Sequence, residues 1–218
     1  MTFLVFIGSE RESTPPRPAR LGERVAMACA RRLTTHQVQH ELVDPLKIDQ
    51  PSPFKPHFSY AKGKAPRALE DLARRIHDAD GYVMVSPEYN HSMSPALAHL
   101  LNHFGSSLFS YKPSAIVTYS AGQWGGARAA VNMRTYLAEL GCLPVSAMVH
   151  VPKAHEIFDE TGAYLDGLDP DHWDGYLDRT VKQLLWWAEA AARQRAHGTA
   201  EKPAAFTRAP SQRNAPGN

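Results

Sequence analysis

The stretch YVMVSPEYNHSMSPALAHLLNHF, residues 82–104, joins a short apolar run, a polar corner and a second apolar segment. The first four residues suit a strand that is buried on both faces of a sheet. Pro87 fixes the backbone and lacks an N–H, so we expect the strand to end just before it. Pro95 suits the first position of a helix, with Ser92 or Ser94 as its cap. The stretch therefore predicts a strand, a loop and a helix in succession.

The same order recurs along the chain. Apolar runs predict strands at residues 3–7, 38–43, 82–86, 115–119 and 145–151. Helical patterns are expected at residues 20–33, 65–78, 95–104, 127–140 and 172–197, and a proline-rich surface loop at 45–66. Alternating strands and helices are typical of a parallel sheet covered on both faces. We therefore predict an α/β protein: a three-layer, doubly wound fold with a five-stranded parallel sheet.

Composition restricts the classes of function. The chain has 218 residues, 43% hydrophobic residues and a net charge of +2, which argues against a nucleic-acid-binding surface. Cys29 and Cys142 lie far apart, outside any metal or redox spacing, and are expected to be buried free thiols. The apolar residues 3–7 form too short a run for a signal peptide or a membrane span. We therefore expect a cytoplasmic protein with no membrane or nucleic-acid partner.

The last part of the chain differs from the rest. Beyond residue 197 it is rich in Pro, Ala, Arg, Ser and Asn, and Phe206 is its one large apolar residue. Such a segment cannot bury enough apolar surface to order itself. We therefore expect one domain over residues 1–197 and a disordered tail over residues 198–218.

The first loop at the carboxyl edge of the predicted sheet reads GSERESTPPRPARLG, residues 8–22. In a doubly wound sheet, ligands bind outside the carboxyl ends of the strands. Gly8 permits a sharp turn, Ser9 offers a hydroxyl, and a helix N-terminus follows. Guanidinium groups near that terminus favour a phosphate, and they belong to Arg11, Arg17 and Arg20. The loop carries neither the Walker pattern nor G-x-G-x-x-G, and an exposed loop with solvated arginines is the alternative.

Two further loops leave the same predicted edge. In the first, Tyr89 supplies a ring and Asn90 can donate and accept hydrogen bonds in one plane. In the second, YSAGQWGGAR at residues 119–128, three glycines allow close backbone approach and Trp124 offers a broad apolar face. Taken together, the three loops predict a phosphate site, groups that read the edge of a heterocycle, and a glycine-lined floor. Ordinary strand–turn–helix junctions without a ligand are the alternative.

These motifs resemble those of the NADPH-dependent FMN reductase family of flavodoxin-like flavoproteins, which includes quinone, azo-dye and chromate reductases. The resemblance spans about residues 3–192. It rests on G-S-x-R at residues 8–11, R-L-G at 20–22, P-E-Y-N at 87–90 and S-x-G-x-x-G-G at 120–126. Of these, P-E-Y-N after the third strand is the specific signal.

The resemblance implies three groups of cofactor-binding residues. The FMN phosphate would be held by Ser9, Arg11, Arg17 and Arg20. The isoalloxazine ring would contact Pro87, Glu88, Tyr89 and Asn90. Its other edge would be lined by Ser120, Gly122 and Gly125. The segment TPPRPA at residues 14–19 lengthens the first loop relative to the family, so the arginine that provides the second basic contact stays open.

The resemblance also implies an activity. Hydride would pass from nicotinamide C4 of NADPH (or NADH) to flavin N5, and the electrons would then pass to a small-molecule acceptor. Because the cofactor carries this chemistry, no protein side chain is expected to act as a catalytic residue, and no metal is expected. The family commonly forms homodimers or higher homo-oligomers. An apolar cluster could be part core and part interface: Leu100, Leu101, Phe104, Leu108 and Phe109.

Other classes of function fit less well. His99 and His103 are spaced to share a helix face with His91 upstream, but H-E-x-x-H is absent. A serine hydrolase would need G-x-S-x-G, which does not occur. The alternative that stays open is a flavodoxin-like electron-carrier or regulatory module that binds FMN without turning over NAD(P)H.

Overall fold

The computed structural model describes residues 1–11 and 20–198, so Arg17 and residues 199–218 of the predicted tail lie outside the described residues. Helices and strands alternate along the chain as the sequence predicts. The strands are β1 (Thr2–Ile7), β2 (Gln39–Val43), β3 (Gly81–Tyr89), β4 (Ser92–Met93), β5 (Pro113–Tyr119), β6 (Leu143–Pro144) and β7 (Val149–Val151). The helices are α1 (Leu21–Thr35), α2 (Arg67–Asp78), α3 (Pro95–Asn102), α4 (Ser106–Phe109), α5 (Ala127–Glu139) and α6 (Pro170–Ala196).

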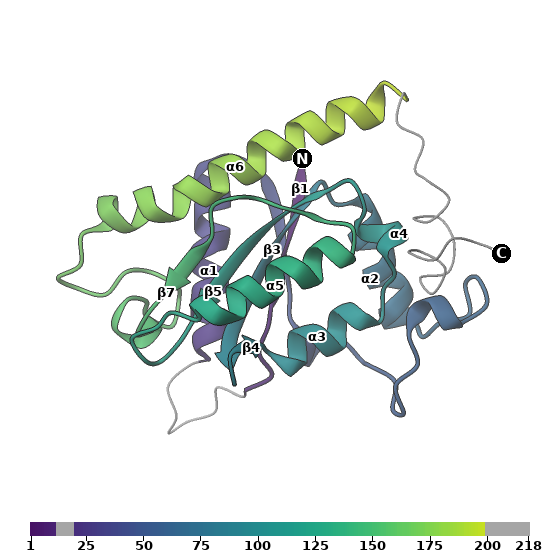
Figure 1. The fold of residues 1–218 in the computed structure, drawn as a ribbon, viewed down its shortest axis with the longest axis horizontal. Coiled ribbons are helices and arrows are strands. Elements are labelled where there is room, and N and C mark those ends of the chain that lie inside the picture. Colours follow the sequence, from purple (N-terminus) through teal and green to yellow (C-terminus); the bar gives the residue numbers. More distant parts are fainter. Residues whose placement is uncertain (12–19, 199–218) are drawn as a thin grey trace.

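The sheet has the strand order β2-β1-β3-β5-β6, and all neighbours along this path are parallel. The chain moves outward from β1 to β2 and then returns past β1 to β3. This is the flavodoxin-like order, whose reversal lies between β1 and β3. The arrowheads of the parallel strands point toward one edge, at the lower left of Figure 1. The predicted fold class is therefore confirmed.

The predicted number of five strands is wrong, because the sheet formed by the described residues has seven. The expected strand at residues 145–151 is split into β6 and β7, and both pieces pair with β5. Between β6 and β7 the backbone leaves the ladder with β5, and its polar groups form hydrogen bonds with side chains of two helices instead. Arg134 of α5 donates to the carbonyls of Val145 and Ser146, and Gln183 of α6 accepts from the N–H of Ala147. These contacts offset the lost ladder bonds.

The expected end of the third strand at Pro87 is also wrong. In β3 the ladder continues through Pro87, which lies opposite Tyr119 of β5, to Tyr89. Asn90 and His91 then adopt left-handed φ values of 51° and 64°, and β4 returns antiparallel along β3. Two consecutive positive φ angles make a tight hairpin turn. A proline is tolerated where the neighbouring strand needs no N–H from that position, so the motif P-E-Y-N forms a hairpin arm rather than a loop.

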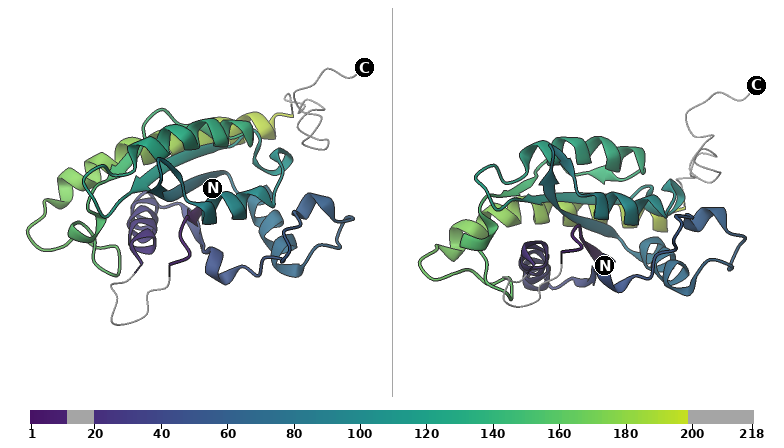
Figure 2. Two further views of the ribbon diagram at one scale, coloured as in Figure 1. Left: turned by 60° about the horizontal axis from the view of Figure 1, so that its bottom comes forward. Right: turned by 90° about the horizontal axis from the view of Figure 1, so that it is seen from below.

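Helices cover both faces of the sheet, with α5 (green) on one side and α1 (purple) on the other in Figure 2. One core lies under α1 and α6, and the other lies under α2, α3 and α5. The alternation of side chains along each strand supplies both cores, as Val5 and Phe6 of β1 illustrate. Cys29 and Cys142 are buried free thiols, and burial raises the pKa of each to about 12.

The predicted interface cluster around α3 is wrong as an interface. Leu100, Leu101 and Phe109 are fully buried, and Phe104 is 1% exposed, so these side chains belong to the core of a single chain. Only Leu108 is partly exposed. The physical reason is that these side chains face the sheet and α2, where they share one core with Leu69, Leu72 and Tyr82.

The start of α3 follows the predicted cap chemistry. The Ser94 hydroxyl accepts a hydrogen bond from the N–H of Ala96 at 3.1 Å, and Pro95 takes the first helical position. This confirms Ser94, of the two serines considered, as the cap. In the described part of the chain, no helix combines the length and apolar character needed to cross a bilayer.

Candidate functional site

The loop after β1 begins with a turn that only glycine fits. A Cβ on Gly8 would collide with the carbonyl oxygen of Val85, which also accepts the Gly8 N–H at 2.7 Å. Ser9 follows, 2% exposed, and its Oγ accepts the N–H of Arg11 at 3.3 Å. Helix α1 then begins at Leu21, and no described side chain caps its first turn. Uncapped N–H groups at a helix start, beside a hydroxyl and an exposed arginine, suit an anion.

Arg20 links the loop after β1 to Asp44, which directly follows β2. Its guanidinium donates from Nη1 to the carbonyl of Ser9 at 2.9 Å and from Nη2 to Asp44 Oδ2 at 2.7 Å. Asp44 in turn accepts the N–H of Leu46 at 3.1 Å. Both charged side chains are buried, Arg20 at 4% and Asp44 at 7% exposure. The structure shows that Arg20 binds the backbone of the loop at Ser9. Contact of Arg20 with a phosphate stays a prediction.

Tyr119, the last residue of β5, joins the loops after β1 and β3. Its buried hydroxyl lies beside Ser9, since a Cβ added to Gly22 would lie close to both the Tyr119 oxygen and the Ser9 Cβ. Burial raises the pKa of Tyr119 well above its usual value, so the hydroxyl stays protonated. Gly22 leaves the space that this ring needs, because a Cβ there would lie 2.5 Å from the Tyr119 oxygen.

Glu88 connects the hairpin arm of β3 to helix α5. Its Oε2 accepts the N–H groups of Arg128 and Ala129 at 3.1 and 3.3 Å, and its Oε1 accepts Arg128 Nη1 at 3.0 Å. The residue before the helix, Gly126, has no side chain to supply a cap. Glu88 therefore caps α5 from another strand and holds the β3 and β5 loops together.

The glycine-rich loop after β5 is organised by Ser120. The Ser120 hydroxyl donates to the carbonyl of Gly122 at 2.7 Å and accepts the N–H of Gly125 at 2.9 Å. Gly125 has a φ of 61°, and a Cβ there would lie 3.1 Å from the backbone nitrogen of Pro152. A Cβ on Gly122 would meet no atom within 4 Å. The loop thus presents backbone to open space at Gly122 and is closely packed at Gly125.

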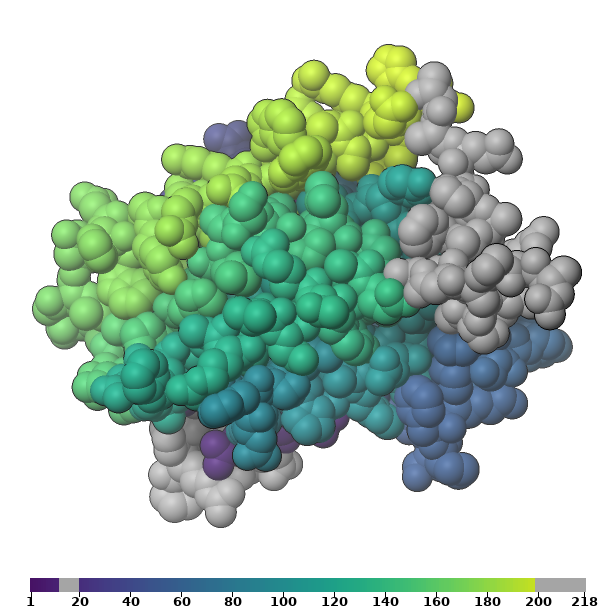
Figure 3. Space-filling model, in the orientation of Figure 1, coloured from purple at the N-terminus to yellow at the C-terminus, as the bar shows by residue number. Residues whose placement is uncertain are grey.

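The predicted site residues that the structure describes lie at one edge of the sheet, where β1, β3 and β5 end. The ends of β1 (purple), the β3–β4 hairpin and the loop after β5 (both teal) surface near one another in the lower part of Figure 3. Pro87 is buried, while Tyr89 and Asn90 are exposed at the rim. Arg17 lies outside the described residues.

Sequence reasoning missed three residues that hold this edge together: Asp44, Tyr119 and Arg128. Each has a position that could have pointed to it. Asp44 directly follows β2, Tyr119 ends β5, and Arg128 lies in the first turn of α5. Residues at the carboxyl end of a parallel strand, or at the start of the following helix, face the ligand edge whatever their type.

The histidines considered for a metal site lie elsewhere. The rings of His99 and His103 are 5.3 Å apart at their centroids, and His103 is fully buried against Phe54. Within residues 1–11 and 20–198, no third His, Cys, Asp or Glu completes a metal-binding group with them. Their contacts with Phe54 give them a packing role under residues 45–66.

Two concavities lie at the opposite edge, near the amino ends of the strands. They measure about 640 and 450 Å³, and the first is lined by residues of β1 and β2, the second by residues of β5, β6 and α6. Neither includes a residue of the three loops. The candidate site at the loop edge is therefore separate from both concavities. Its chemistry suits a ligand with an anionic end at α1 and a flat part against the hairpin and the glycine-rich loop.

Comparison with known proteins agrees with this geometry. The profile of the family described as NADPH-dependent FMN reductase matches residues 1–156. An NAD(P)H-dependent FMN reductase of Pseudomonas aeruginosa is 36% identical over 111 residues, which cover 49% of this chain and 60% of that protein. A quinone reductase of Escherichia coli K12 is 32% identical over 117 residues, covering 51% of this chain and 62% of that protein. The match thus spans less than two thirds of either relative.

Solved structures support the fold. The flavoenzyme FerB, an NAD(P)H:(acceptor) oxidoreductase of Paracoccus denitrificans, superposes with a TM-score of 0.62. It is 21% identical, and the superposition covers 84% of this chain and 96% of that one. The family profile covers most of the chain and includes all three loops, with P-E-Y-N and the glycine-rich loop at the predicted edge. The chain therefore belongs to the NADPH-dependent FMN reductase family.

Proposed function

We propose that this protein is an FMN-dependent NAD(P)H oxidoreductase, which passes electrons from NADPH through bound FMN to a small-molecule acceptor such as a quinone, a flavin or an azo compound. One observation carries the proposal. Three loops, distant in sequence, converge on one edge, where Ser9 and Tyr119 both lie against Gly22 and where Glu88 binds Arg128. Family membership supplies the activity that this edge would support.

The described residues fit FMN. Ser9, Arg11 and the start of α1, which no described side chain caps, would bind its phosphate, since they offer a hydroxyl, a guanidinium and helix N–H groups. The β3–β4 hairpin and the open backbone at Gly122 would border its ring. When bound, FMN accepts a hydride from the nicotinamide and delivers two electrons to the acceptor. The protein's part is to hold the ring and leave one face open.

The proposal extends to the setting of the protein. Residues 1–197 would form one reductase domain, and the domain would act in the cytoplasm as a homodimer or a higher homo-oligomer. The net charge of +2 supports a small-molecule partner rather than a nucleic acid. We propose NADPH rather than NADH as the hydride donor, and the only support for this choice is the description of the family.

Turnover tests the proposal directly. Protein reconstituted with FMN should be yellow and should oxidise NADPH when 2-methyl-1,4-naphthoquinone is added, as followed by absorbance at the nicotinamide band. Protein that binds FMN but never consumes NADPH or NADH would favour the electron-carrier alternative. Failure to bind added FMN would refute both functions.

Arg11→Ala tests the phosphate end of the site. Because hydrogen bonds to a charged group contribute about 1.5–3 kcal/mol, loss of this guanidinium should weaken FMN binding by about 10- to 100-fold. The side chain is exposed, so the melting temperature of the FMN-free protein should not change. Flavin fluorescence quenching measures the affinity, and Arg31→Ala, an exposed arginine farther along α1, is the matched control. Equal affinities for the two variants would contradict the assignment.

A further inference from the structure

The glycine-rich loop presents a tryptophan that the proposed function has not used. Trp124 lies between Gly122 and Gly125 and is 63% exposed. A single exposed aromatic residue is ordinary on a protein surface. This one is also held in place, because the guanidinium carbon of Arg128 lies 5.4 Å from the centroid of its ring. That distance is within the range of a cation–π contact.

Arg128 is itself fixed by the hairpin. Its Nη1 donates to Glu88 Oε1 at 3.0 Å, and Glu88 is held by the backbone N–H groups at the start of α5. The Glu88 side chain is 11% exposed and that of Arg128 is 45% exposed. The contacts thus run from β3 through Glu88 and Arg128 to the indole of Trp124. The exposed ring of Trp124 therefore contacts a guanidinium that β3 holds in place through Glu88.

The charge at this place is positive. Glu88 carries one negative charge, Arg128 carries one positive charge, and the N-terminus of α5 adds roughly half a positive unit. Among the residues that the structure describes, Arg128 uses only Nη1 in a side-chain hydrogen bond. The Arg128 side chain is partly exposed, so its remaining guanidinium N–H groups can donate hydrogen bonds to an anion.

We propose that Trp124 and Arg128 form an acceptor-selecting wall: Trp124 stacks on a planar aromatic acceptor, and Arg128 favours acceptors that carry an anionic group such as a sulfonate or carboxylate. The inference rests on the proposed function, since it concerns the acceptor of the same site. It goes beyond the proposed function because it names the class of electron acceptor that this chain prefers, an aromatic anion. Glu88 acts here as a positioning residue, because it holds Arg128.

Steady-state kinetics with a charged and an uncharged quinone test the wall. We expect Arg128→Gln to lower kcat/KM for 1,4-naphthoquinone-2-sulfonate by about three- to tenfold relative to that for 2-methyl-1,4-naphthoquinone. The glutamine removes the charge but can still donate to Glu88. Trp124→Ala should lower kcat/KM for both quinones. Comparing each variant with the unmodified protein cancels the difference in redox potential between the two acceptors.

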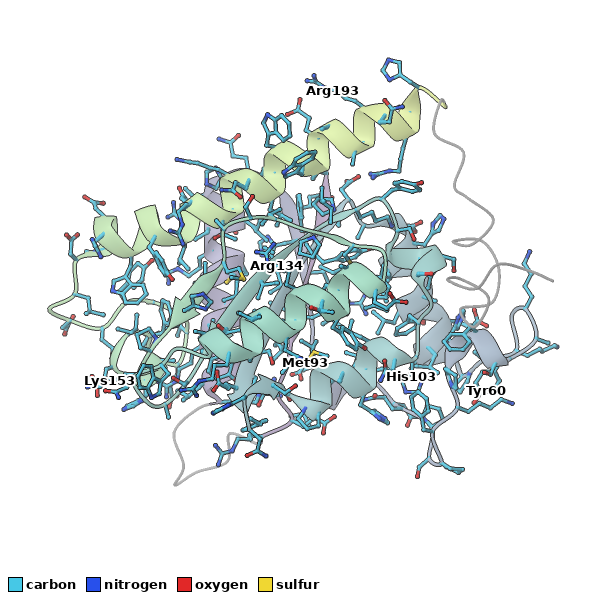
Figure 4. The ribbon with its side chains drawn as sticks, viewed as in Figure 1. Tyr60, Met93, His103, Arg134, Lys153 and Arg193 are labelled. Carbon is cyan, nitrogen blue, oxygen red and sulfur yellow. The ribbon has the colours of Figure 1, made fainter. Side chains whose placement is uncertain are left out.

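The control is Arg193→Gln, which removes the same charge from α6. Figure 4 labels Arg193 near the far end of this helix, well away from Lys153, whose backbone N–H donates to the carbonyl of Gly122. This control should leave the ratio of the two kcat/KM values unchanged. An unchanged ratio in Arg128→Gln as well, or a change of oligomeric state in Trp124→Ala, would overturn the inference while leaving the proposed function intact.

A binding measurement separates the inference from turnover. Isothermal titration of the FMN-loaded protein should give tighter binding of naphthalene-2-sulfonate than of the neutral naphthalene-2-sulfonamide, and Arg128→Gln should abolish the difference. If neither quinone is reduced but this difference persists, the proposed function fails, and Trp124 and Arg128 form a binding site for aromatic anions without a role in selecting acceptors. If the sulfonate and the sulfonamide bind equally, the wall is refuted.

Discussion

Asp44→Ala should lower the free energy of unfolding by about 3–5 kcal/mol, because it removes the carboxylate that compensates a buried guanidinium. Arg20 is 4% exposed, and its Nη2 lies 2.7 Å from Asp44. Among the described residues, Glu23 also lies near Arg20, at 3.9 Å and partly exposed, so it compensates only in part. Urea denaturation of the FMN-free protein measures the loss, with the slope expected to stay constant.

The matched control for this prediction is Asp71→Ala. Asp71 pairs with Arg67 and Arg74 on the exposed face of α2, so its removal should change the free energy of unfolding by less than about 1 kcal/mol. The double variant Arg20→Met with Asp44→Leu should recover much of the stability, since apolar replacement of both charges leaves neither unpaired. If Asp44→Ala is as stable as the control, the buried pair does not hold the loop.

Gly126→Ala should destabilise the protein by about 2–4 kcal/mol, from a left-handed backbone and from a steric clash. Gly126 has a φ of 79°, and an added Cβ would lie 2.8 Å from Thr118 Cβ and 3.3 Å from the backbone nitrogen of Tyr119. Its neighbours belong to β5, an interior strand that cannot move away without disturbing the sheet. Thermal denaturation of the FMN-free protein measures the loss.

Gly122→Ala is the comparison within the same loop. An added Cβ there meets no protein atom within 4 Å, so the FMN-free protein should keep its stability. If the flavin ring occupies this open space, the same methyl group should weaken FMN binding by about tenfold or more. A Gly122→Ala variant that binds FMN normally would show that the ring lies elsewhere, and a stable Gly126→Ala variant would contradict the clash.

Much of the fold follows from local pattern. The apolar runs at residues 3–7 and 115–119 become β1 and β5, because a strand buried on both faces is mostly apolar along its whole length. Ser94 and Pro95 begin α3 as cap chemistry requires. Once strands and helices alternate, a parallel sheet brings the ends of its strands to one edge. The sequence alone was therefore sufficient to predict where the loops after β1, β3 and β5 would meet.

The roles of individual charged residues needed the tertiary structure. The contacts of Arg20 with Ser9 and Asp44, and the capping of α5 by Glu88, could not be predicted from the sequence, whereas the predicted contacts of both residues with FMN stay predictions. The split of the fifth strand likewise depends on Arg134 and Gln183, which lie on two different helices. Local spacing determines which face of a strand or helix a residue occupies. Which groups then lie within hydrogen-bond distance depends on how elements far apart in the chain pack, and no local pattern contains that information.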